Sequence, residues 1–290
     1  DSYDRIANYS WDLGDGATSI NQHTTHKYTT PGSYIPKLIV TTENGCTDTA
    51  VYPLPIRIVA SPKISITNFN NGCVPLVTGF SGNLLATDTS TLTWQWDFGN
   101  GSTSNLQTPL KQTYSVANDY IVNLKVTNSS GCFDTAIRKV EAYPIPVVNA
   151  GEDMWVCLGK NYKLTATGAS TYSWNYNKTL SCLNCADPTA TPTAESRYNV
   201  TGTSIHGCVA SDEVVLKVQN PFKVTASKTD TLCKGSSVEI AANGADTYLW
   251  IPATGLKSVT DAKTIATPDT TTIYKVIGTD IHGCFSDTAS

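Results

Sequence analysis

Cysteine is the residue type with the clearest chemical potential in this chain. Nine cysteines occur among 290 residues, and thiols can form disulfides, hold metals or carry redox chemistry. A Gly-Cys pair occurs four times, ending at Cys46, Cys132, Cys208 and Cys284. Three other cysteines each come ahead of one of these pairs, at Cys73, Cys157 and Cys233. This regular placement predicts structural disulfides formed in an oxidising compartment, and we expect Cys73 to pair with Cys132, Cys157 with Cys208, and Cys233 with Cys284.

The remaining two cysteines, Cys182 and Cys185, form a C-x-x-C motif. Such a motif can be a redox centre, half of a zinc site or a local disulfide. The matching positions of the next repeat are Ser258 and Asp261, so both cysteines are replaced together. Joint replacement favours an optional local disulfide.

Cys46 has no earlier partner within the chain. By the spacing of the other pairs, its partner falls before residue 1. We therefore expect Cys46 to pair with an upstream cysteine, and the 290 residues to be a window of a longer repetitive protein.

Carboxylates and histidines offer weaker candidates. Asp12 and Asp15 lie on a short turn with Asn100 at one matching position, which favours capping of the turn backbone over acid/base catalysis. Asp12, Asp15 and Asp97 remain weak calcium candidates, since few hard oxygen ligands lie nearby. The histidines do not predict a zinc site, and no nucleophilic triad has motif support. The four histidines considered are His23, His26, His206 and His282. We therefore expect no catalytic residues and no cofactor.

The elements that position these residues are repeated strands. Tyr34 and Tyr120 each open an alternating apolar and polar run, which predicts a half-buried antiparallel strand. The Gly-Cys pairs recur about every 76 to 86 residues, the size of one small β-sandwich. The sequence predicts tandem immunoglobulin-like antiparallel β-sandwiches, an all-β fold whose first and last units are partial. We call the units repeats one to four: residues 1–60, 61–144, 145–219 and 220–290.

Tryptophan also follows the repeat. An aromatic residue, any residue and a tryptophan occur in every repeat, and this placement predicts interior packing between two sheets. The tryptophans concerned are Trp11, Trp96, Trp174 and Trp250. Trp155 lies outside the pattern, so it either contacts sugars or covers a joint between domains.

Composition excludes several classes of partner. Only 15% of the residues are charged and the net charge is -4, so no basic field attracts nucleic acid or anionic lipid. No apolar stretch approaches the roughly 20 residues that cross a bilayer. We expect neither nucleic-acid binding nor membrane insertion by this segment.

The motif from Trp11 to Gly16, with its counterpart from Trp96 to Gly101 and a tyrosine-led strand after each, resembles the PKD (polycystic kidney disease) domain family. That resemblance implies an immunoglobulin-like sandwich in an extracellular protein. Repeats three and four lack the Asp-Gly turn and are similar to the Ig-like repeats beside PKD domains in large surface proteins of Bacteroidota, including gliding-motility adhesins. This second resemblance implies type IX secretion.

These resemblances imply a non-enzymatic spacer in a long cell-surface adhesin or fibre. Its partners are expected to be neighbouring repeats, with cell-surface polysaccharide or other surface proteins as further candidates. The alternative is a set of accessory modules, some of them carbohydrate-binding, of a secreted polysaccharide hydrolase or protease. Asp-Thr followed by a small or apolar residue is similar to a Bacteroidota O-glycosylation signal, or merely starts a strand; the threonines are Thr49, Thr135, Thr231 and Thr288.

Overall fold

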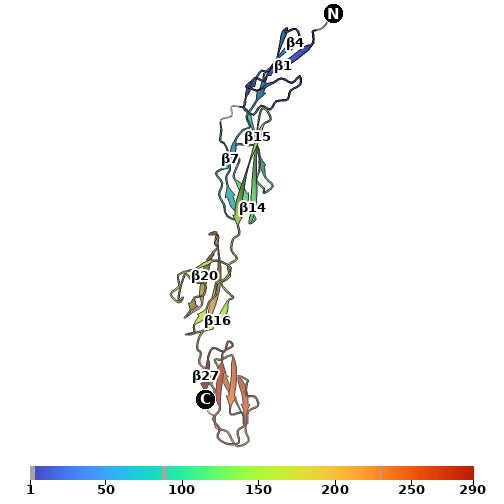
Figure 1. Cartoon of the computed structure of the whole chain (residues 1–290). Coiled ribbons are helices and arrows are strands. Elements are labelled where there is room, and N and C mark those ends of the chain that lie inside the picture. Colours follow the sequence, from blue (N-terminus) through green and yellow to red (C-terminus); the bar gives the residue numbers. More distant parts are fainter. Residues whose placement is uncertain (1–3, 87–89, 229) are drawn as a thin grey trace. The chain divides into compact units, whose positions relative to one another are not determined.

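The chain is built of β-strands. The computed structural model describes residues 4–86, 90–228 and 230–290, which contain strands and turns but no helix (Figure 1). The described residues thus include no helix able to cross a membrane. Two compact units divide the chain, Asp1–Tyr143 and Pro144–Ser290, and each contains two of the predicted repeats. The repeat boundaries near residues 60 and 219 stay predictions.

Repeat two is a complete two-layer sandwich. One layer is a five-stranded sheet in the order β12-β11-β14-β15-β8, and two strand pairs, β10-β7 and β13-β9, make up the rest. The strands are β7 (Ile64–Thr67), β8 (Gly72–Cys73), β9 (Leu76–Thr78), β10 (Ser81–Leu84), β11 (Leu92–Asp97), β12 (Thr103–Ser104), β13 (Gln112–Tyr114), β14 (Asn118–Asn128) and β15 (Phe133–Tyr143). The predicted all-β, immunoglobulin-like fold class is confirmed.

Alternation along β14 builds the core of repeat two. Val122, Leu124 and Val126 point inward and are buried, while the residues between them face solvent, as the two-residue period of a strand requires. Trp96 packs against Phe98, which directly follows β11, and against Phe80, between β9 and β10, with ring centroids 5.6 and 6.1 Å away. The predicted interior role of this tryptophan is therefore confirmed.

Repeat one has strands that correspond to the C-terminal strands of repeat two, but fewer strands pack over them. Its sheet has the order β2-β1-β4-β5, and a separate pair joins β3 to β6. No described strand of repeat one corresponds to β7, β9 or β10, and Trp11 is only half-buried. The strands are β1 (Ile6–Asp12), β2 (Thr18–Ser19), β3 (Gly32–Tyr34), β4 (Lys37–Thr42), β5 (Thr47–Val51) and β6 (Ile56–Ile58).

Repeats three and four are smaller sandwiches, each around one buried tryptophan, Trp174 or Trp250. Repeat three has a sheet in the order β16-β21-β20-β18 beside the pair β17-β19, and repeat four has the sheets β22-β23-β25 and β24-β26-β27. The strands of repeat three are β16 (Met154–Cys157), β17 (Tyr162–Lys163), β18 (Thr171–Trp174), β19 (Thr189–Ala190), β20 (Ser196–Thr203) and β21 (Val209–Gln219). Those of repeat four are β22 (Thr225–Ala226), β23 (Val238–Asn243), β24 (Thr247–Ile251), β25 (Lys263–Ala266), β26 (Lys275–Thr279) and β27 (Ser286–Ala289).

The four repeated tryptophans each make the same kind of hydrogen bond. In each repeat the indole N–H donates to a backbone carbonyl ten or eleven residues later, at 2.8 to 3.0 Å. A buried indole needs such an acceptor. The acceptors are the carbonyls of Asn21, Leu106, Cys185 and Asp261.

Replacing Trp96 tests how far each repeat depends on this side chain. We expect Trp96→Ala to lower the free energy of opening of repeat two by about 3–5 kcal/mol, because it removes a buried aromatic and leaves a cavity. Hydrogen exchange of the β14 amides, followed by mass spectrometry, measures that free energy locally. The matched control is Trp11→Ala, which should cost repeat one clearly less, and equal losses in the two repeats would contradict this account.

Candidate functional site: the Gly-Cys turns and their disulfides

The same turn presents a cysteine four times. The glycine before each cysteine has a φ between 69° and 85°, a region that favours glycine over other residues. Four positions before the cysteine, a polar side chain accepts the cysteine's backbone N–H at 3.0 to 3.2 Å. These side chains are Thr42, Asn128, Ser204 and Asp280. Sequence reasoning missed them, although the signal was a polar residue at one fixed offset.

Asp280 makes the most extensive version of this cap. It is 4% exposed, and its carboxylate accepts the backbone N–H groups of His282, Cys284 and Phe285 at 2.9, 3.2 and 2.5 Å. Burial by itself raises the pKa of Asp280, but the N–H donors of Phe285, Cys284 and His282 outweigh it, and the pKa lies below the usual value. The charged carboxylate therefore holds the turn.

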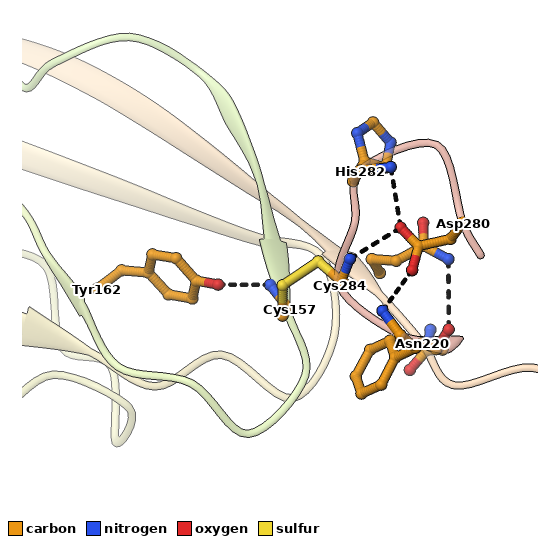
Figure 2. Close-up of a disulfide and its surroundings, with 8 residues drawn as sticks. Cys157, Tyr162, Asn220, Asp280, His282 and Cys284 are labelled. Atoms are coloured by element: carbon orange, nitrogen blue, oxygen red, sulfur yellow. Dashed lines mark hydrogen bonds between the residues drawn. A yellow bond between two sulfur atoms is a disulfide. The ribbon is translucent and has the colours of Figure 1, made fainter. Parts of the chain in front are cut away.

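A disulfide joins this turn to the preceding repeat. Cys284 bonds to Cys157, with a Cα–Cα distance of 5.2 Å and a sequence separation of 127 residues. Figure 2 shows Cys157 on one side of the bond and, on the other, the Cys284 turn folded around Asp280. Cys157 ends β16, and its backbone N–H is bound by the hydroxyl of Tyr162. Repeats three and four are thus linked covalently, and hydrogen bonds hold the backbone of both cysteines.

The predicted pairings within single repeats are wrong. Cys157 does not bond to Cys208, and Cys284 does not bond to Cys233. Cys132 is free, so it does not bond to Cys73. Cys46 and Cys233 are also free, whereas Cys73 and Cys208 are both disulfide-bonded.

Strand length is the physical reason for this error. In repeat three, Cys208 directly precedes β21, while Cys157 lies opposite Gln219 at the end of the same strand. β21 has 11 residues, and such a strand spans roughly 35 Å, whereas disulfide geometry needs Cα atoms within about 7 Å. In repeat two, likewise, Cys132 precedes β15 and Cys73 lies opposite Tyr143 at its end. The early and late cysteines of repeats two and three therefore lie at opposite ends of their sandwiches.

Trp155 and His282 flank the disulfide. Their rings stack at 4.5 Å between centroids with an interplanar angle of 19°, and the Lys217 ammonium lies 5.9 Å from the Trp155 ring. Trp155 was expected either to contact sugars or to cover a joint between domains. The stacking on His282 agrees with the second role, because it occupies one face of the indole. His282 likewise has a local packing role.

The C-x-x-C motif forms the expected local disulfide between Cys182 and Cys185. The carbonyl of Cys185 accepts the indole N–H of Trp174 at 2.9 Å. In repeat four the carbonyl of Asp261 accepts the Trp250 N–H at 3.0 Å without any disulfide. The Cys182–Cys185 bond therefore reinforces a loop whose geometry the fold also produces without it.

In the turns that follow Trp11 and Trp96, aspartate carboxylates accept hydrogen bonds from backbone N–H groups of the same turn. Asp12 accepts the N–H of Gly14 at 2.9 Å, and Asp97 accepts that of Gly99 at 2.9 Å. Asp15 accepts the N–H of Ala17 at 3.1 Å, and its other oxygen lies 2.6 Å from the Nε2 of His26. The His26 hydrogen bond is the main reason that the pKa of Asp15 lies below its usual value. Turn capping is thus observed.

Metal binding by these turns stays a prediction. Within residues 4–86, 90–228 and 230–290, no group of three or more His, Cys, Asp or Glu side chains gathers in a way that suits a metal ion. The calcium candidates Asp12, Asp15 and Asp97 do not meet one another there as such a group.

Aspartates after the Gly-Cys turns tie the last strand of a repeat to its beginning. In repeats two to four an aspartate carboxylate accepts a backbone N–H more than sixty residues earlier, at 2.8 to 3.1 Å. The pairs are Asp134 with Ile64, Asp212 with Ala150, and Asp287 with Val224. Asp134 and Asp287, which precede the candidate threonines Thr135 and Thr288, therefore have a structural role. The four candidate threonines are exposed: Thr49, Thr135 and Thr288 on strands, and Thr231 outside them.

The fold and these turns define a class: tandem immunoglobulin-like β-sandwiches with cysteine-bearing turns. Residues 1–54 and 59–142 match the family model of the PKD domain. These two segments, and thus the N-terminal half of the chain, belong to the PKD domain family. The resemblance noted from the Trp-Asp-x-Gly motifs is confirmed.

Solved structures that match this chain include the PKD1 domain of the metalloprotease PrtV from Vibrio cholerae, with 26% identity over 29% of this chain and 99% of that domain and a TM-score of 0.26. Three N-terminal domains of the outer capsid protein Hoc of bacteriophage RB49 match with 13% identity, 79% and 96% coverage and a TM-score of 0.36. A 1.5-MDa bacterial ice-binding adhesin matches with 11% identity, 74% and 88% coverage and a TM-score of 0.31.

Acidification tests the role of Asp280. Because its folded-state pKa is depressed, Asp280 stabilises repeat four above the unfolded pKa of about 3.9, and that stability is lost as the pH falls through the folded value. We expect Asp280→Asn to lower the melting temperature at pH 7 by several degrees and to flatten its decline below about pH 4. Calorimetric melting curves between neutral and acidic pH measure both effects.

The matched control is Asp269→Asn, which replaces an exposed aspartate of the same repeat. It should leave the melting curve unchanged. An unaltered acid profile in Asp280→Asn would contradict the proposed cap.

Proposed function

We propose that this chain is a non-enzymatic, force-transmitting spacer of an extracellular protein. The observation that carries the proposal is the Cys157–Cys284 disulfide, which links two successive sandwiches covalently. In tandem repeats, each unit contacts chiefly its neighbours, so an array gains length without a change in function. PKD domains in the N-terminal half and disulfides in the C-terminal half support an extracellular setting.

The position of the disulfide determines where tension travels. A pull that enters repeat three through β16 reaches Cys157, crosses the S–S bond to Cys284 and leaves through β27. The segment between the two cysteines, which are 127 positions apart in the sequence, lies outside that path. Its strands include β20, β21 and β26, and they keep their hydrogen bonds while the covalent bond takes the load.

We further propose that the spacer belongs to a cell-surface adhesin or fibre, exported by the type IX route and serving adhesion or gliding. Its partners are neighbouring repeats, and surface polysaccharide or other surface proteins contact parts of the same assembly. Exposure of Thr49, Thr135, Thr231 and Thr288 supports O-glycosylation at these side chains. Intact mass of the native protein tests this last point, because a mass equal to the bare polypeptide would exclude glycans.

Single-molecule pulling tests the spacer role. With handles at the exposed Glu152 and at Ser290 of the full chain, we expect unfolding of the oxidised protein to leave the segment between the cysteines locked. The double variant Cys157→Ser, Cys284→Ser should release about 440 Å more contour length, since each extended residue contributes roughly 3.5 Å.

The control is the double variant Cys182→Ser, Cys185→Ser. That bond spans a sequence separation of 3 and lies within the segment that the Cys157–Cys284 bond keeps out of the force path, so its loss should add no contour length. Equal release from the oxidised protein and the Cys157→Ser, Cys284→Ser variant would show that force does not pass through the disulfide, and the spacer proposal would fail.

A further inference from the structure

Repeat three carries a hollow on its surface beside the local disulfide Cys182–Cys185. The volume of the hollow is about 550 Å³, within the range of small-molecule sites. One wall is the outer face of β18 with the adjoining end of β20, and the other wall is the loop of the disulfide. The lining residues are Ser170, Thr171, Tyr172, Ser173, Asn184, Cys185, Ala186 and Thr203.

The strand wall of the hollow presents hydroxyl groups. Because side chains alternate along a strand, Thr171 and Ser173 both point outward from β18, whereas Trp174 is buried. Thr203 of β20 lies opposite Thr171 in the pairing of these two strands, and side chains that lie opposite each other share one face of the sheet. Three hydroxyl groups from two adjacent strands thus line the hollow.

The loop wall is fixed to the edge of the same sheet. The carbonyl of Leu183 accepts the backbone N–H of Trp174 at 2.7 Å, and the carbonyl of Cys185 accepts its indole N–H at 2.9 Å. Asn184 lies between the two cysteines of the Cys182–Cys185 bond. The disulfide therefore restricts the residue that brings an amide to the hollow, and such restriction lowers the entropy cost of binding a ligand.

The polar side chains of the hollow are not used by the protein itself. Within the described part of the chain, the side chains of the three hydroxyl residues and of Asn184 make no hydrogen bond. Farther along the same face the hydroxyls are paired, since Thr201 Oγ1 lies 3.0 Å from Ser211 Oγ. A hydroxyl can both donate and accept, and an amide offers two donors and an acceptor. The hollow thus offers unused donors and acceptors to a ligand.

The lining also indicates the class of ligand. None of the lining residues is charged, so no side chain there attracts an anion or a cation. A neutral saccharide suits such a lining, because each of its hydroxyls both donates and accepts. We propose that the hollow binds a neutral oligosaccharide through the hydroxyls of Thr171 and Ser173 and the amide of Asn184. The Cys182–Cys185 bond then serves to hold the amide side of the site.

Repeat four has the same fold without these features. Leu249 stands at the position of Ser173, and Thr260 stands at the position of Asn184. The local disulfide is also missing there, although the loop keeps its hydrogen bond to the tryptophan. A hydroxyl, the amide and the disulfide are thus replaced together, which agrees with their belonging to one site.

Ligand-observed NMR on the full chain tests the proposal. Saturation-transfer spectra are recorded with neutral tetrasaccharides, namely cello-, malto-, xylo- and mannotetraose, and with tetragalacturonate as the acidic comparison. Titration of each binder gives its dissociation constant. The main variant is Ser173→Leu, which fills the hollow with the residue that repeat four carries at the matching position.

We expect at least one neutral tetrasaccharide to bind, and Ser173→Leu to weaken its binding at least about ten-fold, because one hydrogen bond is lost and its space is filled. Asn184→Ala should weaken binding similarly. The double variant Cys182→Ser, Cys185→Ser should weaken it less, by about three-fold. Failure of every neutral tetrasaccharide to bind, tighter binding of tetragalacturonate, or unchanged binding in Ser173→Leu would overturn the proposal.

Leu249→Ala is the matched control, since it changes the corresponding exposed position of repeat four. It should leave binding unchanged, and a loss of binding in this variant would contradict the assignment to repeat three. Hydrogen exchange of the β20 amides verifies that repeat three stays folded; if Ser173→Leu alters it, Asn184→Ala in the exposed loop decides the question. The proposal goes beyond the spacer role and can fail separately from it, because the pulling experiment measures the Cys157–Cys284 bond.

Discussion

The length of one strand decides how the cysteines of this protein can pair. In repeats two and three, the Gly-Cys turn places its cysteine at the start of a long strand, and the early cysteine of the same repeat lies at the far end of that strand. Because β15 and β21 each have 11 residues, the two thiols are separated by roughly 35 Å. A bond within the repeat is therefore geometrically excluded, and Cys157 instead bonds to repeat four. The turn caps and the tyrosine hydroxyl beside Cys157 serve to present the thiols for this linkage.

Each sandwich holds itself together without that bond. The buried tryptophan fills the space between the layers and finds its carbonyl acceptor within the same repeat. The aspartates after the turns fasten the last strand to the beginning of the repeat. The Cys157–Cys284 disulfide is therefore not needed to hold one small core together, and it links repeat three to repeat four.

The sequence allowed prediction of the fold class, the interior positions of Trp96, Trp174 and Trp250, and the Cys182–Cys185 bond, because periodicity and local spacing determine these features. Alternation along residues 120–126 was enough to predict a half-buried strand, and the structure has it in β14. The remaining disulfides could not be predicted from spacing, since regular spacing is equally compatible with pairing within a repeat and between repeats. Strand length was the missing quantity: early and late cysteines at opposite ends of one 11-residue strand already exclude the bond. Trp155 was likewise unassignable until its neighbour His282, far along the chain, was known.

Pairing between neighbours also has a consequence for how such a protein changes over generations. If every unit contributes one early and one late cysteine, duplication or deletion of a whole unit leaves each internal thiol with a match, since the new neighbours offer the same two halves. Staples confined to one unit would share this tolerance, but they would not make each newcomer covalently continuous with the units on either side. Selection can therefore change the length of the molecule by whole repeats, and the disulfides between neighbouring repeats are kept without further mutation.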